Sequence, residues 1–555
     1  MTGQITQQTP DTATSSPRWY PAVAGVLAAG AALAAGELLA SFFSPSPGPV
    51  IAVANRVIEY APGWFVELGK SLFGLADKPA LIVGTILTTL LLGVVFGLVA
   101  ARNFMVGAAG FVAFGVLGLA ATAVDPFGTA LAAIISSLAA VVAGITVLRR
   151  MLNLAAPVPV LPTAPTPAVD AETHDEVTDP AATPVVELDS PTSPAVSRRA
   201  FLNWAGATGL VTAGAAVAAN AIRSRSNVSS ARSAVALGPE AESQVTELVA
   251  GAEGGEVATT PGITPLIMPN DDFYLIDTAL IKPQVDPTTW SMRIHGMVDQ
   301  EVTLTYDELV ERADAVAPIT LSCVSNEVGG DLVGNAVWQG VPLVELLDEA
   351  GVQPEATQIA SRSVDGWSCG FPTEAAYDGR TAMVAVAMNG EPLPVAHGFP
   401  ARLVVSGLYG YVSATKWLQE IELTTIDAFD GYWIPRGWSK LGPIKTQSRI
   451  DTPRRGEKVT AGSPVAVAGI AWAPNTGIRT VEVQVDDGPW EEATLGETLG
   501  SDAWRQWVLA WTPTAGPHTL RVRATDESGE TQTSDILPPA PDGATGWHWV
   551  TVEAV

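Results

Sequence analysis

One cysteine, Cys323, stands where this chain of 555 residues could carry out chemistry. It follows a short apolar run at 319–321 and opens a polar, glycine-rich loop at 324–331. A thiolate at the end of a rigid element can serve as a nucleophile or a metal ligand, because the ionised sulfur is the reactive form. The plainer alternative is a buried, inert cysteine.

Further segments with polar and basic residues follow in a fixed order. Residues 388–394 read MNGEPLP, residues 397–405 read HGFPARLVV, and residues 413–418 read SATKWL. With the cysteine loop, these segments resemble the sulfite oxidase-like molybdenum oxidoreductases. An earlier segment at 269–274, PNDDFY, is similar to a stretch that contacts the pterin in that family. The resemblance runs from about residue 263 to the end and does not cover the first half.

The resemblance implies a molybdenum–molybdopterin cofactor, with Cys323 as the catalytic residue and the protein's metal ligand. A soft thiolate balances a hard, oxo-bearing metal and sets its potential. The pterin phosphate requires cations and N–H donors. Arg402 and Lys416 occupy the matching positions, although either alone could form an ordinary surface salt bridge. The other expected cofactor contacts are Asn270, Asp272, Phe273, Tyr274, Asp365, His397, Ser413 and Thr415.

Three positions depart from the sulfite oxidase pattern. Glu327 follows the cysteine loop's Ser-Asn pair where an arginine is expected, and Val386 stands where we expect a tyrosine. The segment Pro538-Pro539-Ala540-Pro541 occupies the place of another arginine. Sulfite is an anion, and arginine holds anions through bidentate hydrogen bonds. Because the expected arginines are absent, sulfite itself is disfavoured as the substrate. We expect a small-molecule substrate, such as an S- or N-oxide or a sulfite-like compound.

Composition excludes several other partners and cofactors. The net charge of -27 argues against a nucleic-acid partner. Two cysteines, Cys323 and Cys369, cannot hold an iron–sulfur cluster, although a disulfide between them would remove the proposed ligand. We also expect no haem, because no CxxCH motif occurs and no histidine lies in a predicted span. Electrons would then pass through a separate electron-transfer protein or a quinone.

The first half predicts membrane segments. The mean hydropathy of the chain is +0.26, and five apolar runs are long enough to span a bilayer. Arg102 and the Arg149-Arg150 pair place the N-terminus in the cytoplasm, and residues 50–77 form interfacial amphipathic helices. Residues 197–202, SRRAFL, resemble a twin-arginine export signal, with an ordinary charged anchor as the alternative. Five spans place the catalytic half outside the cell membrane. The runs are 20–43, 81–100, 104–124, 129–148 and 204–222.

We therefore expect a multi-domain chain with an α-helical membrane domain, an α+β molybdopterin domain and a C-terminal immunoglobulin-like β-sandwich that could form a homodimer. Short alternating runs after residue 458 predict the sandwich. A non-catalytic cell-surface binding protein that retains the fold is the alternative; a transporter is disfavoured, because the spans hold almost no ionisable residue. The expected segments are a disordered N-terminus at 1–19, four spans in 20–150, a disordered linker at 151–196, the export motif and fifth span at 197–223, a tether at 224–262, the catalytic domain at 263–455 and the sandwich at 456–555.

Overall fold

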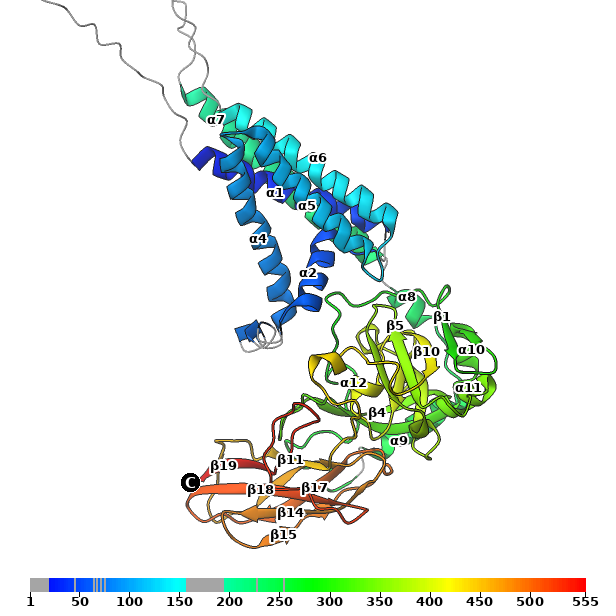
Figure 1. Cartoon of the computed structure of the whole chain (residues 1–555). Helices are drawn as coiled ribbons and strands as arrows, with labels where there is room; N and C mark the ends of the chain where they lie inside the picture. The colour runs from blue at the N-terminus through cyan, green and yellow to red at the C-terminus, as the bar shows by residue number, and fades with distance from the viewer. Residues whose placement is uncertain are drawn as a thin grey trace, which may run out of the picture. The chain divides into compact units, whose positions relative to one another are not determined.

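The computed structural model divides into two compact units, 1–226 and 227–555, and Figure 1 shows their elements. It describes residues 19–555 except 44–45, 63–64, 66–67, 70–71, 74–75, 156–193, 226–227 and 253–254. Most of the two segments expected to be disordered, 1–19 and 151–196, lies outside the described residues.

The first unit confirms the five predicted apolar helices, each long enough to cross a membrane. The helix α1 packs against α4, α6 and α7. Its contact with α4 depends on small residues, because a Cβ at Gly25 would lie 1.9 Å from the carbonyl oxygen of Gly93. The five helices are α1 (Trp19–Ala40), α4 (Asp77–Ala100), α5 (Phe104–Ala123), α6 (Ala130–Ala155) and α7 (Pro194–Arg225).

The expected amphipathic segment contains one well-defined helix, α2 (Pro49–Tyr60), after the 3-10 turn η1 (Ser41–Phe43). One face of α2 is buried and packs mainly against α4 and α5. The backbone N–H of Val50 donates to Glu37 Oε1 at 2.9 Å. The one acidic residue of the first predicted span therefore accepts a hydrogen bond from the first turn of α2, where the helix dipole favours an anion.

The predicted α+β domain contains two sheets. In the order β2-β1-β10-β5-β6, only the β1–β10 pair is parallel, so this sheet is mixed as expected. The other sheet is antiparallel, with the order β3-β4-β7-β8 and β9 paired to β7. Thr305 caps α10 (Tyr306–Glu311) in a capping box with Glu308, as the sequence predicts. The remaining elements are β1 (Ser291–Gly296), β2 (Val302–Thr305), β3 (Ala315–Ser322), β4 (Val333–Pro342), α11 (Leu343–Ala350), β5 (Gln358–Ser363), β6 (Ser368–Pro372), η3 (Thr373–Ala376), β7 (Ala382–Met388), β8 (Glu391–Pro392), η4 (Val395–His397), β9 (Arg402–Val405), α12 (Gly410–Ser413), β10 (Leu418–Thr424) and η5 (Ile434–Arg436).

The C-terminal domain consists of two sheets, in the orders β11-β13-β17-β16 and β12-β19-β18-β14-β15. Buried apolar residues from both sheets share one core, as in an immunoglobulin-like sandwich. The sequence reading missed β11, β12 and β19. The strands are β11 (Gln447–Thr452), β12 (Lys458–Val459), β13 (Val465–Trp472), β14 (Ile478–Val485), β15 (Trp490–Glu492), β16 (Thr494–Leu495), β17 (Arg505–Trp511), β18 (Gly516–Asp526) and β19 (His548–Ala554).

The expectation of a tether at 224–262 is wrong for most of its length. This segment forms α8 (Ser229–Ser233) and α9 (Pro239–Ala252), and α9 packs against β3 and β4. Leu237 is buried in the core of the catalytic domain. The guanidinium of Arg232 donates to the carbonyl of Leu393 at 2.8 Å. A few apolar residues spaced among Ser, Ala and Gly are enough to fix the segment, a pattern that composition alone does not reveal.

Candidate active site around Cys323

The end of β3 delivers Cys323 into a loop with a fixed shape. The Cys323 N–H donates to the carbonyl of Leu332 at 2.9 Å. In return, the Leu332 N–H donates to Asn326 Oδ1, also at 2.9 Å. Only 8% of Cys323 is exposed. Both cysteines are free, so the alternative of a disulfide to Cys369 is wrong. The loop presents a single, well-positioned thiol.

Arg402, at the start of β9, is a buried cation without an acidic partner. Its Nη1 donates to the carbonyl of His397 at 3.1 Å, and its guanidinium lies over the Trp338 ring, 4.8 Å from the centroid. Among the described residues, no carboxylate forms an ion pair with Arg402. Burial lowers the pKa of this guanidinium to about 10. The side chain therefore carries a charge that the folded protein does not neutralise.

Tyr274 connects this cation to the thiol. Burial raises the pKa of the Tyr274 phenol, Cys323 raises it further, and Arg402 opposes the shift. Tyr274 also stacks on Phe273, which packs edge-to-face against the Trp338 ring that lies beside Arg402. Tyr274 therefore keeps its proton across the physiological range and can donate a hydrogen bond inside the site.

Lys416 adds a second buried cation. Its Nζ lies 2.8 Å from Asp277 Oδ2 and donates to the carbonyl of Ala396 at 3.0 Å. Burial lowers the pKa of Lys416 to about 8, against the effect of Asp277. Asp277 also pairs with Lys282. Sequence reasoning missed Asp277, because it lies in an irregular segment without a motif.

His397 and the segment at 269–274 form the wall beside Arg402. Burial, and then the charge of Arg402, lower the pKa of His397 to about 4, so the ring is neutral. Its Nε2 lies 2.9 Å from the carbonyl oxygen of Asn270, which assigns the proton to this nitrogen. Phe273 packs edge-to-face on His397 and stacks on Tyr274. Asn270, Phe273 and Tyr274 thus lie together.

Three further predicted residues are Asp272, which is exposed, and Ser413 and Thr415, which form contacts inside the domain. Asp272 is exposed, and no described contact joins it to the site. Ser413 Oγ donates to the carbonyl of Tyr409 at 3.1 Å, which closes α12. Thr415 Oγ1 lies 2.6 Å from Ser361 Oγ and 3.1 Å from Cys369 Sγ. Both hydroxyls hold the loop before Lys416.

Asp365 lies near Lys416, at the end of β5. Burial raises the pKa of its carboxyl, and the nearby Asp277 adds to this effect, whereas Lys416 opposes it. Its Oδ1 accepts a hydrogen bond from the Trp367 N–H at 3.1 Å. This residue therefore belongs to the same charged cluster as Lys416.

Position 386, where the family pattern has a tyrosine, lies in the core of the domain. Val386 is fully buried in the middle of β7. The tyrosines near Cys323 are Tyr274 and Tyr409. Burial, with contributions from Asp542 and Cys323, raises the pKa of Tyr409 to about 12.

The connector between the catalytic domain and the β-sandwich, residues 427–455, lies near Tyr409 and the cysteine loop. The Tyr409 N–H donates to the carbonyl of Gly442 at 2.7 Å, and the Ser439 N–H donates to that of Pro541 at 2.9 Å. From β11, Arg449 Nη1 donates to the carbonyl of Gly330 in the cysteine loop at 2.7 Å. The connector and β11 therefore pack against the cysteine loop as well as between the two domains.

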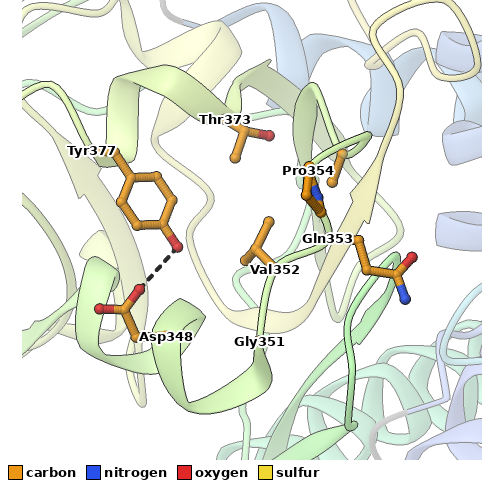
Figure 2. Close-up of a pocket in the computed structure, with 8 residues that line it drawn as sticks. Asp348, Gly351, Val352, Gln353, Pro354, Thr373 and Tyr377 are labelled. Atoms are coloured by element: carbon orange, nitrogen blue, oxygen red, sulfur yellow. Dashed lines mark hydrogen bonds between the residues drawn. The ribbon is translucent and has the colours of Figure 1, made fainter.

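One surface pocket lies elsewhere in the catalytic domain. It has a volume of about 520 Å³ and contains none of the predicted site residues. Figure 2 shows the Tyr377 hydroxyl directed at Asp348, to which it donates at 3.2 Å. The pocket is lined by Asp348, Gly351, Val352, Gln353, Pro354, Ala356, Thr373 and Tyr377.

The site around Cys323 fits an anionic cofactor that also needs a thiolate. Arg402 and Lys416 are buried cations, and only Lys416 has an acidic partner among the described residues. A phosphate would supply the missing negative charge. Cys323 lies in the same cluster through Tyr274. Arg402 and Lys416 could therefore hold the phosphate while Cys323 binds the metal.

Comparisons with known proteins show which families this chain resembles. The family model "Oxidoreductase molybdopterin binding domain" matches residues 279–433, and "Bacterial Ig domain" matches residues 447–522. The uncharacterized oxidoreductase YuiH of Bacillus subtilis is 31% identical over 170 residues, covering 31% of this chain and 82% of YuiH. Human mitochondrial sulfite oxidase is 28% identical over 321 residues, 49% of this chain and 58% of that protein. The chain thus spans just over half the length of the sulfite oxidase. The sulfane dehydrogenase SoxCD from Paracoccus pantotrophus is 24% identical, with a TM-score of 0.43, and the match covers 50% of this chain and 76% of that chain.

Proposed function

Because this chain belongs to the sulfite oxidase-like molybdopterin oxidoreductases, we propose that it is a membrane-anchored enzyme that transfers an oxygen atom to or from a small molecule. In this proposal, Cys323 is the protein ligand of the molybdenum. One observation carries it: the buried Arg402 guanidinium has no carboxylate partner among the described residues, and it shares a site with Cys323. A protein without an anionic ligand would gain nothing from that arrangement.

When bound, the molybdenum cofactor supplies the two-electron chemistry of oxygen-atom transfer. The chain's own residues bind and orient it. Arg402 and Lys416 hold the phosphate, and neutral His397 fixes the segment at 269–274 through the Asn270 carbonyl. Tyr274 remains protonated beside Cys323 and can donate a hydrogen bond to a substrate oxygen. The remaining predicted contacts, including Asp365, are proposed to border the pterin.

An uncharged substrate fits the charges around the site better than sulfite does. Two lysines of the connector already have acidic partners: Lys440 lies 2.7 Å from Asp430, and Lys445 lies 3.2 Å from Asp542. A cation that is already paired attracts an anionic substrate less strongly. Glu327, which stands where an arginine is expected, is exposed on the cysteine loop. These features support an S- or N-oxide as the substrate.

The proposed location is the outer face of the cell membrane, with the N-terminus in the cytoplasm. Five helices are long and apolar enough to cross a bilayer. The arginine pair of the export motif lies at the start of α7, and the twin-arginine route would export a folded, cofactor-loaded protein. Electrons would pass to or from a separate electron-transfer protein or a quinone. Association through the C-terminal domain remains a prediction.

Purified, detergent-extracted chain tests this function. We expect about one molybdenum per chain by elemental analysis. We also expect reduction of dimethyl sulfoxide or trimethylamine N-oxide with a reduced viologen dye as the electron donor. Turnover of sulfite with ferricyanide but of neither oxide would contradict the substrate assignment. A folded chain without metal would favour the non-catalytic binding protein instead.

A further inference from the structure

An irregular loop of the catalytic domain, residues 275–281, exposes an unusual concentration of large apolar side chains. Leu275 is 45% exposed, Ile276 is 42% exposed and Ile281 is 49% exposed. Single exposed apolar residues are ordinary on a protein surface, but a cluster of them indicates a contact with another apolar phase. The ion pair between Asp277 and Lys282 joins the residue after Ile276 to the residue after Ile281. The three apolar side chains thus belong to one short, exposed loop.

The chain enters the catalytic domain beside this loop. Val228 is buried in the domain core, and its N–H donates to Gln284 Oε1 at 3.3 Å. Ile281 is only three residues before Gln284, so it lies within about 10 Å of this contact along the chain.

Val228 is also close to the end of the last apolar helix. It is the third residue after Arg225, where α7 ends. Because an extended residue spans at most about 3.5 Å, chain length alone limits the separation of Arg225 and Val228 to about 10 Å. If α7 crosses the bilayer, the surface around Val228 must therefore lie within a short distance of the lipid headgroups.

From these observations we infer that Leu275, Ile276 and Ile281 insert into the membrane interface. The partner is the lipid surface itself, because α7 brings that surface within reach and the loop offers apolar side chains to it. This inference rests on the proposed membrane anchoring.

Membrane insertion would act on the proposed active site. Asp277 lies in the same loop and pairs with Lys416, which is a proposed cofactor contact. The lipid surface would then hold the loop in the position that supports this pair. It would also bring one side of the site near the bilayer, where a lipid-soluble electron carrier could approach.

Nitroxide labels on the full-length chain in phosphatidylglycerol-containing nanodiscs test this inference. Label positions are Ile276→Cys in the loop, Ile536→Cys as a control that is 79% exposed in the C-terminal domain, and Val211→Cys in α7, which is 72% exposed. Both native cysteines are buried, and the unsubstituted chain measures their background labelling. Relaxation of each label by oxygen and by a water-soluble nickel complex is then compared.

We expect position 276 to favour oxygen over nickel at least several-fold more than position 536. Equal nickel access at 276 and 536, with position 211 in lipid, would overturn this inference and leave membrane anchoring intact. Nickel access at position 211 would instead refute the anchoring and the inference with it. Shielding of position 276 from both reagents, with dipolar broadening between labels, would assign the loop to contacts between copies and also overturn the inference.

Discussion

Replacing Arg402 with methionine should have opposite effects on the cofactor-free and cofactor-loaded protein. Without an anion, the guanidinium is a buried charge with no carboxylate partner among the described residues. Methionine has a similar length and carries no charge. Replacement of buried ions by apolar residues of similar volume is often neutral or stabilising. With the cofactor in place, the same change removes a phosphate contact.

The structure sets the size of this effect. A pKa lowered to about 10 by burial corresponds to a cost of about 3 kcal/mol for keeping the guanidinium charged. Loss of the hydrogen bond from Arg402 to the His397 carbonyl returns about 2 kcal/mol of that. The methionine sulfur can replace the contact of the guanidinium with the Trp338 ring. The net gain for the cofactor-free protein is therefore about 1 kcal/mol, or a rise of about 2–4 °C in Tm for a domain of this size.

The assay compares protein from cofactor-deficient and cofactor-competent cells by scanning fluorimetry and molybdenum analysis. Arg402→Met should raise the Tm of the cofactor-free chain and lower the molybdenum content of the loaded chain. Arg521→Met, in β18 of the C-terminal domain, is the matched control and should leave molybdenum content unchanged. A lower Tm in the cofactor-free chain together with full molybdenum content would refute the reasoning, because Arg402 would then be a structural residue.

Three further predictions concern the loop and the buried groups. Asn326→Ala should destabilise the protein by about 1 kcal/mol, because it leaves the partly buried N–H of Leu332 without its acceptor, and Asn326→Asp should retain most of the stability; thermal melting checks both. The pKa of His397 is lowered to about 4, so the unfolded chain binds this proton first on acidification, and stability should fall by up to about 3 kcal/mol between about pH 6.5 and 4. His397→Gln should flatten that part of a plot of Tm against pH, and an unchanged slope would contradict the assignment. Burial raises the pKa of Cys369 to about 11, so its thiol stays protonated, and Cys369→Ala should keep its molybdenum in elemental analysis.

Periodic patterns in the sequence were sufficient for the regular elements. Apolar runs identified the five long helices, the Thr305 capping box identified α10, and short alternating segments identified the central strands of the sandwich. These patterns reflect which side chains of a local segment are buried, and the order of apolar and polar residues is enough to reveal them. The helices of the segment at 224–262 could not be predicted from such patterns, because they depend on a few contacts with distant strands, such as that of α9 with β3.

Motifs located the candidate site, but not the partners of its residues. Cys323, Arg402 and Lys416 were predicted from their segments. Asp277 was not, because its role depends on a long-range ion pair with Lys416. Val386, which stands where the family pattern has a tyrosine, lies in the core of the domain within β7, a position that the motif alone does not reveal. Spacing along the chain does not determine which side of a strand faces the site.

X-ray absorption at the molybdenum edge tests the central claim most directly. The wild-type chain and Cys369→Ser should both show the two sulfurs of the pterin and one protein thiolate bound to the metal. Cys323→Ser should lose one sulfur from that shell, or lose the metal entirely. An unchanged sulfur shell in Cys323→Ser at full molybdenum content would contradict the assignment of Cys323 as the ligand.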